Sequence, residues 1–242
     1  MGLRVHTVHS ANINELIERY PCLKCLKSMR VPKDGMHTWK INNSYFRYSN
    51  QEGYAIQVMF IGKTGYGKST TLNQIVGKEV FETSDVSACT KDLYEALYKT
   101  SPFDSTFFSL GDLPGVGESH YADDHYYTWY KEMLRKSDVV VYVLRADQRD
   151  FAVDEMIFKN LFSSDDKKKV ILALNYADKI EPVNRKRGLT SEQLYSLQRK
   201  VYEVSRIFEM PRSNILYYSA VEKINLDLLV ERISDKIGSK FL

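Results

Sequence analysis

A glycine-rich segment between an apolar run and a polar stretch has the clearest chemical signal in the sequence. Residues 58–73 read VMFIGKTGYGKSTTLN and match the pattern G-x-x-x-x-G-K-[ST] at every specified position. Small residues let successive backbone N–H groups converge on phosphate oxygens, and a helix beginning at Lys68 adds the positive end of its dipole. The preceding apolar run, YAIQVMFI, supplies the strand that this mechanism requires, which favours a phosphate site over an ordinary glycine-rich turn.

The same pattern predicts a role for each residue of the segment. Lys68 is expected to reach the β- and γ-phosphates as a catalytic residue, and Ser69 is expected to ligate Mg²⁺. The nucleotide-binding residues predicted for this loop are Gly62, Lys63, Thr64, Gly65, Tyr66, Gly67, Lys68, Ser69 and Thr70.

A second motif, GDLPG at 111–115, follows a predicted strand about 50 residues after the loop. Ligands of mainly parallel sheets bind beyond the carboxyl ends of the strands. Asp112 can hold the hydration shell of Mg²⁺ there, and Gly115 can offer its backbone N–H to a γ-phosphate. D-x-x-G is also a common turn, so its position after a strand is what favours the functional interpretation.

Two further motifs predict recognition of guanine. NYAD at 175–178 follows a strand, and the Asp178 carboxylate can accept two hydrogen bonds from the guanine N1–H and N2–H₂, whereas adenine would leave this charge unpaired. Asn175 and Tyr176 complete this motif as nucleotide-binding residues. Ser219 and Ala220 follow the last predicted strand, where a backbone N–H can lie near the guanine carbonyl.

Alternating short apolar runs and amphipathic stretches position these motifs. This alternation predicts an α/β fold with a mainly parallel sheet and helices on both faces. The predicted strands are 55–61, 93–98, 106–110, 139–144, 170–174 and 215–219, and the predicted helices are 68–76, 123–136, 151–162, 190–208 and 225–237. Residues 51–242 are therefore expected to form the nucleotide-binding domain.

The first 50 residues lack a strong period and are expected to form an N-terminal, helical appendage, with candidate helices at 11–20 and 21–30. Cys22 and Cys25 form a C-x-x-C, and Cys89 is the third cysteine. No second C-x-x-C accompanies this pair, and the histidines are scattered along the chain. This favours structural cysteines over a zinc or redox site.

Composition adds few constraints. The 242 residues are 43% hydrophobic and 27% charged, which is typical of a globular protein, and the net charge of +3 allows an acidic partner without arguing for one. No apolar run is long enough for a transmembrane helix, and the first 20 residues lack the core of a signal peptide, so we expect a cytoplasmic protein.

The four motifs, in this order, resemble those of the translation-factor-class GTPases over residues 54–237. Among them the sequence most resembles the Era-like group with the bacterial YfjP/YeeP-type GTPases, with kinship to immunity-associated and chloroplast-import GTPases. Further residues that contribute to the resemblance are Thr90 within VSACTK, DQRDF at 147–151 followed by Asp154, and NYADKIEP at 175–182. The resemblance implies a six-stranded sheet with one antiparallel edge strand, and a Thr90 that caps Mg²⁺ when GTP is bound.

The sequence departs from this family in three places. Tyr176 replaces the lysine of N-K-x-D that packs on the base, although an aromatic ring can also cover a purine face. Val116 stands where Ras-like enzymes have the glutamine that orients water, so slow hydrolysis is expected. Gly65 replaces an asparagine that often accompanies activation by potassium, which is therefore not supported.

Two residues are candidates for the missing catalytic group. His120 follows the Asp112–Gly115 turn, and Arg149 lies in the loop after the strand at 139–144. Arg149 can cross to a facing subunit as an arginine finger in a GTP-dependent homodimer, which the immunity-associated relatives suggest, or can simply pair with Asp150 or Asp154 on the surface.

Three functions remain open at this stage. The first is a switch that binds GTP and GDP with Mg²⁺ and hydrolyses GTP slowly, and the second is a GTP-gated assembly or scaffold protein with little turnover. An ATP-dependent small-molecule kinase is the third, but it does not explain Asp112–Gly115 or Asn175–Asp178. Ribosomal or other RNA is compatible with the family as a partner, but no sequence feature supports it.

Overall fold

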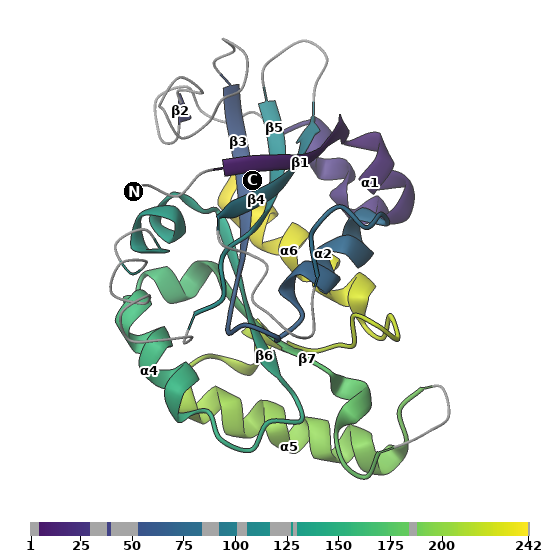
Figure 1. Ribbon diagram of the computed structural model, residues 1–242, viewed down its shortest axis with the longest axis vertical. Helices are drawn as coiled ribbons and strands as arrows, with labels where there is room; N and C mark the ends of the chain where they lie inside the picture. The colour runs from purple at the N-terminus through teal and green to yellow at the C-terminus, as the bar shows by residue number, and fades with distance from the viewer. Residues whose placement is uncertain are drawn as a thin grey trace.

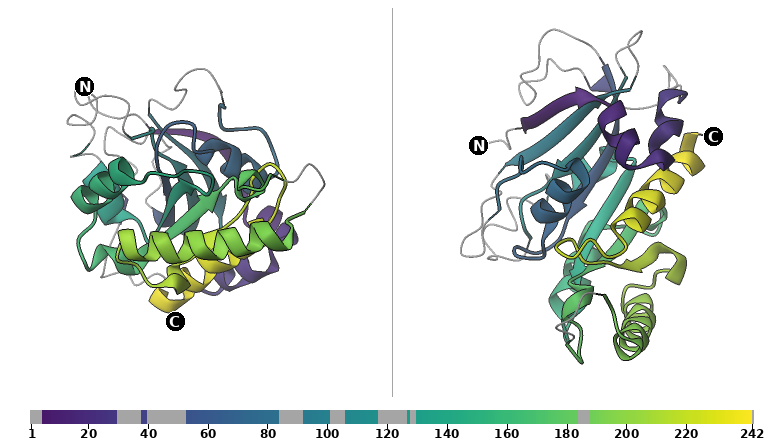
Figure 2. Two further views of the ribbon diagram at one scale, coloured as in Figure 1. Left: turned by 90° about the horizontal axis from the view of Figure 1, so that it is seen from below. Right: turned by 90° about the vertical axis from the view of Figure 1, so that its right-hand side faces the viewer.

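The computed structural model describes residues 5–29, 38–39, 53–83, 92–100, 106–116, 127, 130–183 and 188–241. They form one mainly parallel sheet with helices around it (Figures 1 and 2). The α/β architecture predicted from the alternation of apolar and amphipathic stretches is confirmed.

All six predicted strands are present in one sheet. They are β3 (Gly53–Ile61), β4 (Leu93–Lys99), β5 (Thr106–Asp112), β6 (Val139–Arg145), β7 (Val170–Asn175) and β8 (Ile215–Tyr217). The strand order is β1-β4-β5-β3-β6-β7-β8, and only β4 and β5 run antiparallel along this path. β6 and β7 are buried almost throughout because helices cover both faces, which explains their nearly continuous apolar sequence.

The sheet differs from the six-stranded prediction in two additional strands. β1 (Val5–Asn12) pairs parallel with β4, and the short β2 (Thr38–Trp39) pairs antiparallel with β3. The antiparallel strand β4 therefore lies inside the sheet and β1 occupies the edge, which corrects the expected edge position of β4. The sequence of β1, VHTVHSAN, has no apolar alternation because most of its residues are only half-buried.

The helices that follow the strands are α2 (Lys68–Val76), α4 (Ala152–Leu161), α5 (Ser191–Ile207) and α6 (Leu226–Phe241). Residues 130–136 are also helical, as expected from the predicted helix at 123–136. α5 begins with a capping box in which Thr190 and Gln193 satisfy each other's backbone N–H groups, which fixes its start at the predicted residue.

The N-terminal region contains the helix α1 (Asn14–Arg19) and the 3-10 helix η1 (Pro21–Lys27), and η1 packs beside α6 (Figure 2). Leu16, Leu23 and Leu26 belong to the same hydrophobic core as the sheet. Cys22 and Cys25 are free thiols in η1, and the Cys25 Sγ lies 3.5 Å from the Ser234 Oγ of α6. Within the described residues no group of three or more histidine, cysteine or acidic side chains is arranged to hold a metal.

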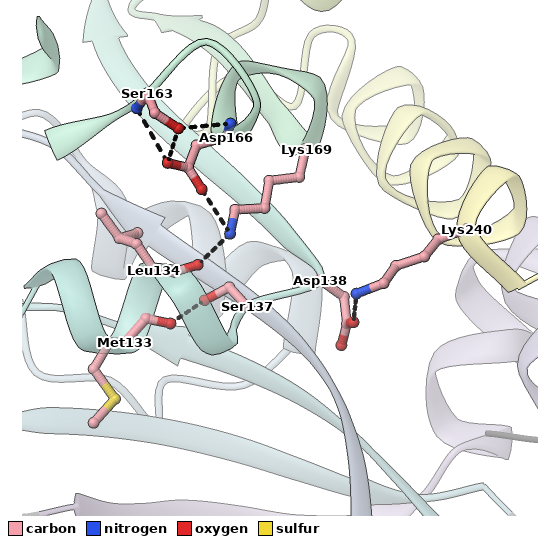
Figure 3. A network of polar contacts seen from close by, with 8 residues as sticks. All are labelled: Met133, Leu134, Ser137, Asp138, Ser163, Asp166, Lys169 and Lys240. Atoms are coloured by element: carbon pink, nitrogen blue, oxygen red, sulfur yellow. Dashed lines mark hydrogen bonds and ion pairs between the residues drawn. The ribbon is translucent and has the colours of Figure 1, made fainter. Parts of the chain in front are cut away.

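Polar contacts hold the C-terminal helix and the start of β6 together (Figure 3). The Lys240 Nζ lies 2.5 Å from the Asp138 Oδ1, and the other oxygen of this buried carboxylate accepts from the backbone N–H of Gln57 in β3 at 2.8 Å. Nearby, the Lys169 Nζ donates to the carbonyl of Leu134 at 2.6 Å and pairs with Asp166 at 3.4 Å. These contacts fix the amino end of β6 and thereby help to position its carboxyl end at Arg145.

Among the residues that the structure describes, no helix combines the length and the apolar composition that a membrane-spanning segment requires.

Candidate nucleotide-binding site

The phosphate-loop segment lies between β3 and α2, as its sequence pattern requires. Gly67 caps α2 in the left-handed region, with φ 83°, and a Cβ at this position would lie 2.4 Å from the Asn175 Nδ2. Glycine is needed here both for its backbone angle and for the close approach of Asn175. The first turn of the helix is closed by the Thr71 N–H, which donates to the carbonyl of Gly67 at 2.9 Å.

Lys68 points back across the loop that precedes it. Its Nζ donates to the carbonyl of Gly62 at 3.0 Å and to the carbonyl of Lys63 at 3.1 Å, and the side chain is buried. The ammonium group therefore lies inside the ring of loop backbone, where phosphate oxygens would converge on a structure of this type. The structure places the predicted catalytic lysine in the loop with the other glycine-rich residues.

Ser69 and Asp112 come together from α2 and the end of β5. The Ser69 Oγ lies 2.5 Å from the Asp112 Oδ2, and Asp112 is 1% exposed. A carboxylate and a hydroxyl from facing elements are oxygen donors of the kind that Mg²⁺ takes together with substrate phosphates and water. These two predicted metal residues therefore fit a magnesium ion, while the third, Thr90, lies outside the described residues.

The turn after β5 closes against the phosphate loop. A Cβ at Gly115 would lie 2.0 Å from the Thr64 Oγ1 and 2.7 Å from the Thr64 backbone nitrogen, so only glycine allows this contact. The Val116 N–H donates to the carbonyl of Gly62 at 3.3 Å, and the Val116 side chain is buried, so it presents no polar group to a water molecule. Tyr130 supports the turn with a hydrogen bond from its hydroxyl to the carbonyl of Pro114 at 3.1 Å.

Asn175 joins three of the predicted motifs. Its Nδ2 donates to the carbonyl of Tyr66 at 3.0 Å, and its Oδ1 accepts from the Ala220 N–H at 3.1 Å. The residue is 2% exposed, so both hydrogen bonds are shielded from water. We predicted that a backbone N–H of Ser219 or Ala220 lies near the guanine carbonyl. In this structure the Ala220 N–H donates to Asn175, and the Ser219 N–H donates to the carbonyl of Ile224 at 3.0 Å.

Tyr176 takes a left-handed backbone conformation, with φ 62°, directly after β7. Its hydroxyl donates to the carbonyl of Gly65 at 3.1 Å, so the side chain reaches the tip of the phosphate loop. The Arg145 guanidinium lies 4.3 Å from the ring centroid and is held by two hydrogen bonds to Asp147, at 3.0 and 2.8 Å, which raise the pKa of Arg145. Sequence reasoning did not identify Arg145, because an arginine at a strand end has no distinctive spacing.

Asp178 follows in the same turn. Its Oδ1 is buried and has no hydrogen-bond partner among the described residues, whereas the backbone carbonyl of Asp178 accepts from the Gln193 Nε2 at 3.2 Å. A buried carboxylate oxygen without a partner is costly unless a ligand provides donors. The backbone is thus fixed by α5 while a carboxylate oxygen is left for donors such as those of guanine.

Of the two candidates for the missing catalytic group, His120 and Arg149, the structure describes only Arg149. His120 lies outside the described residues. The Arg149 side chain is 89% exposed, and its Nη2 lies 3.9 Å from the Glu181 Oε2. The surface ion pair of Arg149 is therefore with Glu181, and not with Asp150 or Asp154 as the alternative to an arginine finger predicted. It lines a cavity of about 790 Å³ together with Lys179, Arg199 and Tyr202, next to the turn that contains Asp178.

Comparison with known proteins places these motifs in a family. A family model described as 50S ribosome-binding GTPase matches residues 57–176. The protein YfjP of Escherichia coli (strain K12) is 29% identical over 184 residues, which cover 76% of this chain and 63% of YfjP. GTPase Era of Alkaliphilus metalliredigens is 27% identical over 179 residues, which cover 73% of this chain and 54% of that protein. The chain thus spans less than two thirds of the length of both relatives.

A solved structure extends the similarity to the fold of nearly the whole chain. Toc33 from Arabidopsis thaliana, in complex with Mg²⁺ and GMPPNP, superposes with a TM-score of 0.61 at 19% identity, over 94% of this chain and 92% of Toc33. The similar fold, the family model matched over residues 57–176 and the motifs assembled at the carboxyl ends of the strands lead to one conclusion: this chain has the P-loop GTPase fold and is similar to GTPase Era.

Proposed function

We propose that this protein is a guanine-nucleotide switch that binds GTP and GDP with Mg²⁺ and hydrolyses GTP slowly. The observation that carries the proposal is the position of Asn175, which bonds both the phosphate loop and the backbone of Ala220. Three residues later in the same turn, Asp178 has a buried carboxylate oxygen with no hydrogen-bond partner among the described residues. Phosphate binding and base recognition are thereby mechanically joined in one site. A kinase for small molecules would have no use for this connection.

Each residue has a defined task in this proposal. Lys68 neutralises phosphate charge, the Gly115 N–H serves the γ-phosphate, and Asp178 selects guanine. Ser69 and Asp112, with Thr90, would hold Mg²⁺, which supplies charge stabilisation at the β- and γ-phosphates. Because Val116 is buried and apolar, the chain itself provides no water-orienting side chain at that position, and turnover should be slow.

The partner and location are further parts of the proposal. Dimerization is important for the GTPase activity of the chloroplast translocon components atToc33 and psToc159. The exposed Arg149 supports a similar GTP-dependent homodimer here, whereas no described feature points to RNA. We place the protein in the cytoplasm, where GTP is available.

Calorimetry with purified, nucleotide-stripped protein tests the proposal. We expect GDP and GTP to bind at least about tenfold more tightly than ADP and ATP, a difference of about 1.4 kcal/mol. Equal affinities for guanine and adenine nucleotides would contradict the proposal, and so would GTP binding that is insensitive to removal of Mg²⁺.

A further inference from the structure

The loop between β6 and α4 contacts the phosphate loop through a buried polar network. The Tyr66 hydroxyl donates to the Gln148 Oε1 at 2.5 Å and lies 3.3 Å from the Asp154 Oδ2. The Gln148 Nε2 donates to the same Asp154 oxygen at 2.8 Å, and the Lys63 Nζ lies 3.7 Å from it. Two residues of the phosphate loop, Lys63 and Tyr66, thus converge on one carboxylate from a different element.

Burial makes this network sensitive to the loss of any member. Asp154 is fully buried and Tyr66 is 7% exposed. Burial raises the pKa of the Asp154 carboxyl, while its hydrogen bond from Gln148 and the nearby Lys63 charge lower it. A charge in this position costs free energy, which argues that its contacts to the loop do more than fill space.

The start of α4 does not depend on the carboxylate alone. The Tyr142 hydroxyl of β6 donates to the backbone carbonyl of Asp154 at 3.3 Å, and the Ala152 N–H bonds the Asp150 side chain at 2.8 Å. The helix therefore has its own attachments to the sheet, and the Asp154 side chain is directed at the phosphate loop. This separates a contact that serves the helix from one that serves the loop.

We propose that Gln148 and Asp154 are positioning residues that hold the phosphate loop in its binding conformation through Tyr66 and Lys63. The inference rests on the proposed function, since it concerns how that site is kept in place. Asp154 touches neither base nor phosphate in this account. It fixes Tyr66, whose backbone carbonyl in turn accepts from Asn175 at 3.0 Å, so both ends of the nucleotide site depend on it.

Nucleotide affinities of two single variants, their double variant and one control test this inference. Tyr66→Phe removes one hydroxyl, and Asp154→Asn keeps the shape of the side chain. We expect each to weaken GDP binding by about three- to tenfold, the effect of losing one buried hydrogen bond. GMP presents one phosphate to the loop in place of two and should lose less affinity. Because the two residues share one network, the double variant should weaken GDP binding less than the product of the single effects.

Tyr142→Phe is the matched control, because it removes a buried hydroxyl that holds α4 but does not touch the loop. It should lower the midpoint of thermal unfolding and leave the dissociation constant for GDP within about twofold, because its hydroxyl bonds the backbone carbonyl of Asp154 and not the carboxylate that contacts the loop. A folded Tyr66→Phe protein with wild-type GDP affinity contradicts the inference, as does an equal loss for GDP and GMP in all three variants. Failure of the proposed function is a different result, because in that case the wild-type protein itself binds no guanine nucleotide. If only the inference fails, the wild type binds GDP and the variants bind it equally well.

Discussion

Asp178 is the residue on which base selectivity should depend, because one of its carboxylate oxygens is buried and has no hydrogen-bond partner among the described residues. Asp178→Asn replaces an acceptor with a donor. We expect GDP affinity to fall by at least about tenfold and xanthosine diphosphate to become the preferred ligand, since a ligand mismatch leaves buried groups unpaired. Competition against a fluorescent nucleotide measures both. An equal loss of affinity for guanine and xanthine nucleotides would mean that Asp178 supports the fold of the site and does not select the base.

Ser69 tests the metal site at the same scale. Ser69→Ala removes the hydroxyl that lies beside Asp112, so the affinity for GTP should no longer improve when Mg²⁺ is added, while GDP binding without metal is retained. Ser69→Thr keeps the hydroxyl and serves as the control, with Mg²⁺ dependence like that of the wild type. Titration of Mg²⁺ at fixed GTP separates the two variants. Unchanged Mg²⁺ dependence in the alanine variant would exclude Ser69 as a ligand.

The sequence predicted these residues because each belongs to a short motif with fixed spacing. The motif residues lie together beyond the carboxyl ends of the strands, as expected: Lys68, Ser69, Asp112 and Asn175. Arg145 and Gln148 were not predicted as parts of the site, because their contacts to Tyr176 and Tyr66 depend on how two loops meet in space. Spacing along the chain contains no record of such a contact.

Among the elements, β4 contains an acidic side chain in an unusual place. Both oxygens of Glu95 accept hydrogen bonds, from Thr7 in β1 at 2.9 Å and from Ser109 in β5 at 2.8 Å, and the residue is 3% exposed. Burial raises the pKa of the Glu95 carboxyl above its ordinary value. The stabilisation that Glu95 contributes is therefore fully present below the pKa that Glu95 has in the unfolded chain, and it is lost as pH rises through the pKa that Glu95 has in the folded protein.

Glu95→Gln removes this titration while keeping the size of the side chain. The midpoint of thermal unfolding of the variant should be near that of the wild type in acid and higher than it at pH 8, where folding of the wild type requires Glu95 either to bury a charge or to take up a proton. Scanning calorimetry across this pH range makes the comparison. Glu18→Gln, at an exposed position of α1, is the control and should follow the wild type. A variant less stable than the wild type at pH 8 would show that the ionised carboxylate is stabilising.

The strands β3 to β8 were predictable because apolar runs of five to eight residues separate amphipathic stretches. β1 was not, because its sequence VHTVHSAN has no alternation of apolar and polar residues, and its pairing depends on β4 some 88 positions later. The residues 1–50 assigned to an appendage thus include a strand of the main sheet. A boundary at residue 50 stays a prediction.

For the whole molecule, the proposed hydrolysis of GTP has to proceed with Val116 in the position of the water-orienting residue. The isolated monomer should turn over at about 10⁻³ s⁻¹ or more slowly, as unassisted GTPases do. If Arg149 acts across a dimer, turnover per molecule should rise with protein concentration, and Arg149→Ala should abolish the rise. Arg206→Ala, at an exposed site of α5, is the control. Flat specific activity, or a fully active Arg149→Ala protein at high concentration, would point to an external activator.

The position of β1 has a consequence for how the chain folds during synthesis. Val5 pairs with Leu93 and Asn12 with Lys99, so β1 must wait for residues up to 99 before its partner strand has been synthesised. Closing a loop of that length is slow compared with local helix formation, and segments nearer the N-terminus emerge before those that follow them. Until then β1 lacks its partner β4, and η1 lacks α6, which is synthesised still later. The N-terminal residues should therefore be among the last to become protected from hydrogen exchange during refolding.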